Sequence, residues 1–138
     1  MIPSTLSISE ETKEIRALIV GDNANLRKLL RYNLEQQCHL IISEEKADAD
    51  RVMQKVHAFI PALLFLDIRL PGGSSLSLPE RIKRDYPKIV VIALARCDLS
   101  KYRQAAIQRG VNYFLTKRAT TYHEVVELVK FISTNLIL

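Results

Sequence analysis

Five short apolar runs, separated by segments with helical periodicity, are the feature that most constrains the fold of this chain. The runs occupy residues 15–20, 39–43, 62–66, 89–95 and 111–116. Nearly continuous apolar runs of this length are typical of strands that are covered on both faces. The intervening and closing segments, residues 23–37, 46–59, 77–86, 99–109 and 121–136, carry apolar residues three and four positions apart, which predicts amphipathic helices.

The strict alternation of strand and helix predicts an α/β fold. Right-handed crossovers leave few topologies other than a parallel sheet with helices on both faces. Five strands favour the order 2-1-3-4-5 of the flavodoxin-like (βα)5 three-layer sandwich, in which ligands bind at the carboxyl ends of the strands, between strands one and three. A chain of 138 residues fits one domain, so we expect a loose extension over residues 1–14 and a single domain over residues 15–138.

Composition narrows the class of protein further. Hydrophobic residues make up 48% of the chain and charged residues 25%, the balance of a soluble globular protein. The apolar runs are far shorter than the roughly 18 residues that a spanning helix needs, and the N-terminus lacks the apolar core of a signal peptide. The two cysteines, Cys38 and Cys97, have no metal-ligand spacing, so we expect reduced thiols in a cytoplasmic protein that does not bind membranes.

Three charged residues follow the first, third and fifth apolar runs: Asp22, Asp67 and Lys117. Taken alone, Asp67 would be a capping or turn residue before Pro71 and the two glycines that follow it. The carboxyl ends of parallel strands meet at one edge of a sheet, however, so the three side chains are expected in one crevice. Two carboxylates suit Mg²⁺ together with a phosphoryl group, a carboxylate can act as a nucleophile, and lysine can neutralise phosphoryl oxygens.

The order of four segments, "LIVGDN", "LFLDIRLPGG", "VIALARCD" and "GVNYFLTKR", resembles the receiver domain of two-component response regulators. The resemblance covers about residues 15–136. It implies that Asp67 accepts a phosphoryl group from a histidine kinase or a phosphotransfer protein, in the presence of Mg²⁺. It also implies that Asp22 is a direct metal ligand, that Arg69 offers its backbone carbonyl to the metal, that Lys117 pairs with the phosphoryl group, and that Phe114 is the aromatic residue whose rotation reports phosphorylation.

Four positions depart from the pattern of that family. Gly21 stands where the family usually has a first acid, so the affinity for Mg²⁺ is expected to fall. Ala95 replaces a serine or threonine whose hydroxyl bonds the phosphoryl group, a hydrogen bond worth roughly 1.5–3 kcal/mol. Arg96 replaces a small residue and could either substitute for the metal cation beside the two aspartates or point to water, and Arg118 replaces a proline.

Three classes of function therefore remain open. The first is a phosphoacceptor receiver, whose only catalysis is its own phosphorylation and dephosphorylation; this is not a metabolic enzyme. The second is a degenerate receiver that acts as a phosphorylation-independent protein-interaction module, a reading that Gly21, Ala95 and Arg96 favour. The third is a phosphohydrolase of the haloacid-dehalogenase type, which would need a second aspartate two residues after the nucleophile, where this chain has Arg69.

A basic segment suggests where partners bind. Between Arg96 and Arg118 lie six basic residues and one acid, Asp98. This segment covers the predicted fourth helix and fifth strand, the face that receivers commonly use for homodimers and partners. The excess of basic residues is explained either by a charged face that is only exposed to solvent or by a surface that binds an acidic partner. Direct nucleic-acid binding is not expected of these residues, and the sequence does not identify the kinase, the signal or the output.

Overall fold

The expected alternation of strands and helices is confirmed. The computed structural model describes residues 14–68, 77–96 and 100–136. Its elements, in chain order, are β1 (Ile15–Val20), α2 (Ala24–Gln37), β2 (Leu40–Glu45), α3 (Ala49–Phe59), β3 (Leu63–Ile68), α4 (Leu78–Asp85), β4 (Val90–Ala95), α5 (Ser100–Gln108), β5 (Tyr113–Thr116) and α6 (Tyr122–Leu136). None of the helices in these described ranges is long and apolar enough to cross a bilayer.

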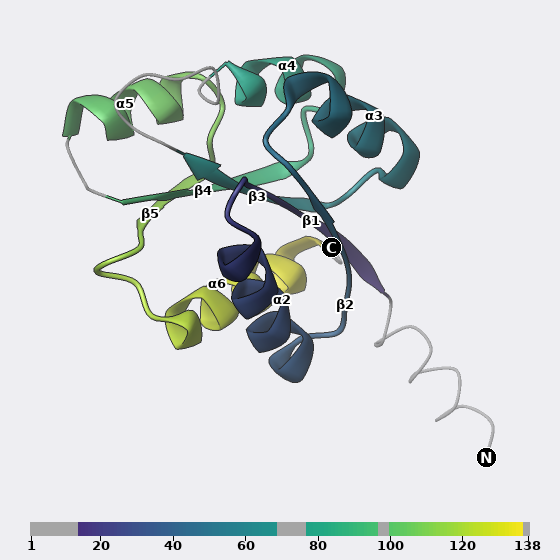
Figure 1. Cartoon of the computed structure of the whole chain (residues 1–138), viewed down its shortest axis with the longest axis vertical. Coiled ribbons are helices and arrows are strands. Elements are labelled where there is room, and N and C mark those ends of the chain that lie inside the picture. The colour runs from purple at the N-terminus through teal and green to yellow at the C-terminus, as the bar shows by residue number, and fades with distance from the viewer. Residues whose placement is uncertain (1–13, 69–76, 97–99, 137–138) are drawn as a thin grey trace.

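The five strands form one parallel sheet in the order β2-β1-β3-β4-β5, as the sequence predicts. Helices α3, α4 and α5 cover one face of the sheet, and α2 and α6 cover the other (Figure 1). Each face has its own apolar core, because successive strand residues point to opposite sides. In β3, for example, Leu64 and Leu66 pack beneath α3 and α4, whereas Leu63 and Phe65 pack beneath α2 and α6.

Local signals set the helix ends. The side chain of Asn23 accepts hydrogen bonds from two backbone N–H groups in the first turn of α2, and Asp48 does the same for α3, as N-cap residues do. Because Asp48 is the cap, α3 begins three residues later than the predicted segment. Pro79 lies in the first turn of α4, the one place in a helix where proline is tolerated.

One shifted strand end affects the site. The sequence predicts that Asp67 follows the third strand, but β3 continues to Ile68 and includes Asp67. The reason is pairing with β4, where Asp67 lies opposite Leu94 and Ile68 lies opposite Ala95. The Asp67 carboxyl is therefore held by two neighbouring strands rather than by a loop. Arg69 and the Pro-Gly-Gly loop lie outside the described residues.

Candidate functional site

Asp67 and Lys117 meet at the carboxyl edge of the sheet. Only 6% of Asp67 is exposed, and the Nζ atom of Lys117 lies 2.7 Å from its Oδ1 atom. The backbone places Lys117 there, because its N–H donates to the carbonyl of Ala95 at 2.8 Å, one residue beyond the β4–β5 pairing. The contact is an ion pair without directed hydrogen-bond geometry, so Oδ1 is a buried acceptor that lacks a hydrogen bond within the described part of the chain.

Gly21 packs directly against Asp67. A Cβ atom added to Gly21 would lie 2.8 Å from the Cβ of Asp67 and 3.4 Å from its Oδ2 atom. Carbon atoms that are not bonded prefer separations of about 3.5–4.0 Å, so a side chain at this position would displace Asp67 or the β1 backbone. Gly21 is therefore more than a missing acid, because the lack of a side chain there lets β1 and β3 approach closely behind the carboxylate.

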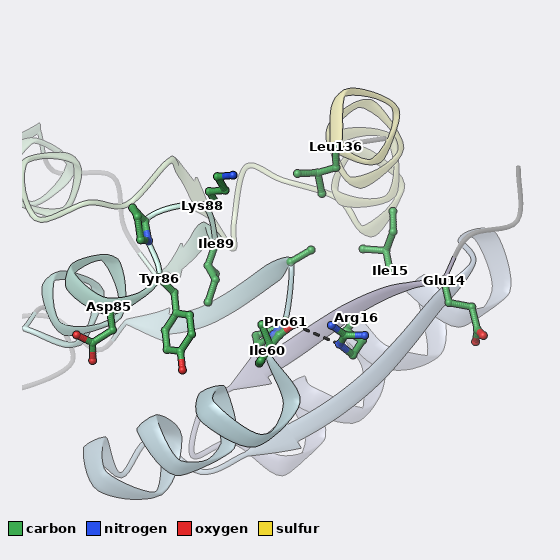
Figure 2. A pocket seen from close by; sticks show the side chains of 12 residues that line it. Glu14, Ile15, Arg16, Ile60, Pro61, Asp85, Tyr86, Lys88, Ile89 and Leu136 are labelled. Atoms are coloured by element: carbon green, nitrogen blue, oxygen red, sulfur yellow. Dashed lines mark hydrogen bonds between the residues drawn. The ribbon is translucent and has the colours of Figure 1, made fainter. Parts of the chain in front are cut away.

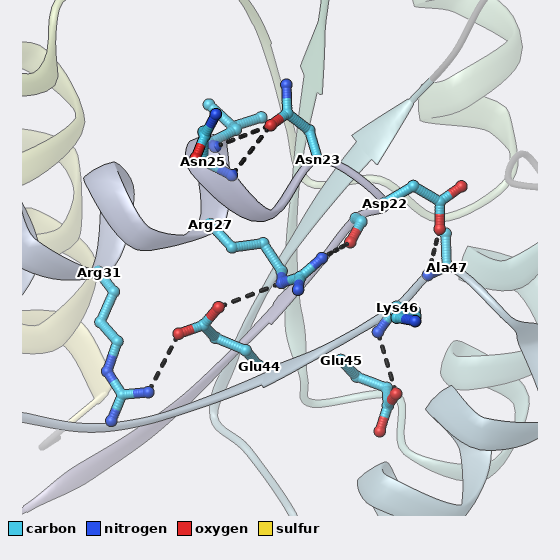
Figure 3. A network of polar contacts seen from close by, with 11 residues as sticks. Asp22, Asn23, Asn25, Arg27, Arg31, Glu44, Glu45, Lys46 and Ala47 are labelled. Atoms are coloured by element: carbon cyan, nitrogen blue, oxygen red, sulfur yellow. Dashed lines mark hydrogen bonds and ion pairs between the residues drawn. The ribbon is translucent and has the colours of Figure 1, made fainter.

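Asp22 lies at the same edge, but it is exposed and one of its carboxylate oxygens already accepts a hydrogen bond. Its Oδ1 atom accepts a hydrogen bond from the backbone N–H of Ala47 at 3.1 Å (Figure 3). No group of three or more His, Cys, Asp or Glu side chains that could hold a metal forms among the described residues. The carboxylates of Asp22 and Asp67 nevertheless provide the oxygen ligands that suit Mg²⁺, which is usually held by one or two carboxylates plus phosphate and water.

A charged network that the sequence analysis did not anticipate fixes the turn between β1 and α2. Arg27 donates to the carbonyl of Gly21 through Nη1 and pairs through Nε with Glu44 at 3.1 Å. The other oxygen of Glu44 accepts from Arg31, also at 3.1 Å (Figure 3). Arg27 and Arg31 are one helical turn apart on α2, and that spacing is the sequence signal that could have indicated a shared acidic partner.

Of the other residues expected at the site, the structure describes Ala95, Phe114 and Arg96. Ala95 is fully buried at the end of β4 and places a methyl group there, and Phe114 is buried with it in the core beneath α5. The guanidinium of Arg103, on α5, lies over the Phe114 ring, 5.1 Å from its centroid, a distance at which a cation and an aromatic ring attract each other. Arg96 is exposed and forms no ion pair with Asp22 or Asp67 in the described structure.

Comparisons with known proteins agree on one family. The family model described as "Response regulator receiver domain" matches residues 17–130. The response regulator GacA of Pseudomonas protegens is 24% identical over 118 residues, which make up 86% of this chain and 55% of GacA. A 14.6 kDa protein of Leptolyngbya boryana is 30% identical over 116 residues, covering 82% of this chain and 86% of that protein. The chain thus spans about half the length of GacA.

Solved structures show the same fold. The signal receiver domain of the putative response regulator NarL from Mycobacterium tuberculosis superposes with a TM-score of 0.74 at 22% identity, covering 88% of this chain and 97% of that one. A CheY-like receiver domain protein from Methanospirillum hungatei gives a TM-score of 0.72 at 20% identity, with 86% and 93% covered. The backbone fold of this chain is therefore similar to that of solved receiver domains.

Proposed function

Because the chain belongs to the response regulator receiver domain family of two-component signalling, we propose that Asp67 accepts a phosphoryl group from a histidine kinase or a phosphotransfer protein. The observation that carries the proposal is the pairing of Asp67 with Lys117, 2.7 Å apart, at the carboxyl edge of the sheet. A carboxylate is a competent nucleophile for phosphoryl transfer. A lysine beside it can neutralise charge on the transferred group.

The transfer conserves atoms and charge. A carboxylate oxygen of Asp67 forms a bond to phosphorus while the bond between phosphorus and the donor's imidazole nitrogen breaks, and the imidazole keeps that electron pair. The product is an aspartyl phosphate. Attack of water on phosphorus then releases inorganic phosphate and restores the carboxylate. The ammonium group of Lys117 stays near the oxygen atoms that carry the charge in both steps.

We propose that Asp22, Asp67 and the backbone carbonyl of Arg69 hold Mg²⁺ weakly. When bound, the ion supplies positive charge to the phosphoryl oxygens. Gly21 contributes no carboxylate, and one oxygen of Asp22 already accepts from Ala47, so fewer oxygen ligands are free than two adjacent acids would offer. The protein is on this proposal a cytoplasmic phosphoprotein with no catalysis beyond its own phosphorylation and dephosphorylation.

Incubation with a small phosphodonor and Mg²⁺, followed by intact-mass measurement, tests the proposal. Wild-type protein is expected to gain one phosphoryl group, and the Asp67→Asn variant is expected to gain none. Equal gain by the two proteins would mean that another residue is the acceptor. No gain by wild type over a range of Mg²⁺ concentrations would refute the proposal.

A second candidate, a receiver that binds partners without phosphorylation, is favoured by the surroundings of Phe114. Ala95 carries no hydroxyl, and Arg103 lies over the Phe114 ring. Loss of the hydroxyl removes one hydrogen bond that would make Phe114 respond to phosphorylation. An NMR comparison of phosphorylated and unmodified protein distinguishes the candidates, because a coupled receiver should show shifts at Phe114 and along α5, whereas an uncoupled one should show them only beside Asp67.

For either candidate, we propose that partners bind the face formed by α5 and β5. Lys101, Arg103 and Arg109 are exposed there, and Ile107, 47% exposed, adds an apolar contact. A basic face with an apolar residue suits an acidic protein surface or a homodimer. Sedimentation of wild type and Ile107→Glu, each at low and high salt, tests this surface. A self-association that neither salt nor the substitution changes would exclude it.

A further inference from the structure

A groove with a volume of about 590 Å³ opens at the amino-terminal end of the sheet, the opposite edge from Asp67. Three chain segments line it, residues 14–16 at the start of β1, residues 60–62 between α3 and β3, and residues 85–89 between α4 and β4, together with Leu136 at the end of α6 (Figure 2). Ligand sites for small organic molecules commonly measure 300–1,000 Å³. The groove is therefore large enough for such a molecule.

Most of the groove surface is apolar. The apolar residues that line it are Ile15, Ile60, Pro61, Ala62, Tyr86, Pro87, Ile89 and Leu136. Two of these belong to the most exposed large apolar residues described, since 49% of Ile60 and 38% of Leu136 is accessible. A gathering of partly exposed apolar side chains around one hollow marks a binding surface more often than scattered ones do. Occupation of the groove would remove these groups from water.

The backbone of Ile60 provides a second, independent observation. Ile60 ends α3 in the left-handed conformation, with φ 46° and ψ 68°, and its N–H donates to the carbonyl of Val56 at 2.8 Å. Glycine is the usual residue at such a helix end, and a β-branched residue there is a steric outlier. Strain of this kind is often retained where a side chain has a function. Ile60 thus combines a strained backbone with a side chain that lines the groove.

Arg16 gives the groove a fixed cationic group. Its Nε donates to the last carbonyls of α3, to Phe59 at 2.7 Å and to Ile60 at 3.2 Å. Its two Nη atoms have no hydrogen bond within the described residues and remain available as a fork that matches a carboxylate. Lys88, also on the groove wall, offers a second cation, and no ion pair between described residues involves it.

Two acids limit what the groove can accept. Glu14 and Asp85 line its two ends, with Arg16 between them (Figure 2). They would repel a second negative charge or a polyanion such as nucleic acid. The favoured occupant is thus one anionic group joined to an apolar body. We infer that the groove binds a small amphiphilic monocarboxylate, with its carboxylate on Arg16 and its apolar body against Ile60, Ile89 and Leu136. This site does not depend on phosphorylation of Asp67.

Titration of the whole 138-residue chain with decanoate, followed by ¹⁵N NMR, tests the inference. Amide shifts are expected in the non-proline residues of segments 14–16, 60–62 and 85–89 and not around Lys117. Nonyltrimethylammonium, which has the same alkyl chain but the opposite charge, is expected to bind at least about tenfold more weakly, since it cannot accept hydrogen bonds from Arg16. Equal binding of the two probes, shifts centred elsewhere, or no saturable shifts would overturn the inference.

The Ile60→Gly variant separates binding from stability. It relieves the left-handed backbone strain, so Tm is expected to be unchanged or higher, while decanoate affinity falls at least about fivefold because an apolar contact is lost. Lys88→Gln is expected to weaken binding about threefold, a loss typical of an exposed charge pair. Arg84→Gln, which removes an exposed cation on α4 outside the groove, is the matched control. Unchanged decanoate affinity in Ile60→Gly would refute the proposed site.

Discussion

Replacing Gly21 with aspartate puts back the acid that the family usually carries, and a count of metal ligands alone predicts tighter Mg²⁺ binding. The packing around Gly21 predicts instead a loss of stability and no gain in Mg²⁺ affinity. Any side chain at this position meets Asp67 first, because an added Cβ lies 2.8 Å from the Asp67 Cβ and 3.4 Å from its Oδ2 atom. Both Cβ atoms move only with their backbones, so β1 or β3 must shift.

The size of the effect follows from this contact. Forcing extra atoms into a packed interior costs about 1–3 kcal/mol, and the new carboxylate adds like-charge repulsion to a carboxylate that is only 6% exposed. For a domain of this size, each kcal/mol corresponds to about 3–5 °C in Tm. We therefore expect Gly21→Asp to lower Tm by roughly 5–10 °C. Gly21→Ala, which adds the contact without the charge, should account for most of that loss.

Thermal melting and a Mg²⁺ titration followed by ¹⁵N NMR measure the two consequences separately. Gly21→Asp is expected to melt at a lower temperature and to bind Mg²⁺ no more tightly than wild type. Ala24→Asp is the control, because it adds the same charge at an exposed position in the first turn of α2 without touching Asp67. A Gly21→Asp protein that keeps its Tm and gains Mg²⁺ affinity would show that Asp67 leaves room for a side chain at position 21.

Two further predictions concern charged groups. Lys117→Met leaves the buried carboxylate of Asp67 without its counter-charge and is expected to lower the unfolding free energy by about 1–2 kcal/mol. This loss is smaller than for a fully buried pair, because a third of the Lys117 side chain is exposed. Urea denaturation measures the loss, with Lys28→Met as the control at an exposed site. Hydrogen bonds from the backbone and hydroxyl of Thr121 lower the pKa of Glu124 below its usual 4.5, so their stabilisation is present above pH 4.5 and is lost as pH falls through the lowered pKa. Thr121→Ala removes the hydroxyl donor, so the pKa of Glu124 should rise part of the way toward 4.5. An unchanged Glu124 midpoint in a carboxyl NMR titration would show that the hydroxyl does not lower this pKa.

The sequence predicts the layers and strand order because both follow from periodicity. Each apolar run is continuous and each helical segment has one apolar face, so few topologies are compatible with the pattern. The end of β3 was less predictable, because the polar Asp67 marks the end of the apolar run while pairing with β4 extends the strand to Ile68. A strand end of this kind depends on a neighbour that is distant in sequence.

The proximity of Asp67 and Lys117 was predictable from the sequence, but the other contacts around Asp67 were not. Parallel strands bring Asp67 and Lys117 to one edge, so their proximity follows from topology. The close approach of Gly21 to Asp67 depends on the spacing of two backbones, which no residue pattern specifies. The ion pair between Arg27 and Glu44 joins α2 to β2 across seventeen positions, and only the folded chain shows that these side chains meet.

Locating the phosphoryl group on the chain tests whether Asp67 is the phosphoacceptor. Borohydride reduction of the protein after treatment with a phosphodonor and Mg²⁺ converts an aspartyl phosphate to homoserine, and peptide mass spectrometry then identifies the converted residue. Conversion is expected at Asp67, dependent on Mg²⁺ and strongly reduced in Lys117→Met. Conversion at Asp22 or at any other acid, or none under conditions in which a control receiver is converted, would show that Asp67 is not the phosphoacceptor.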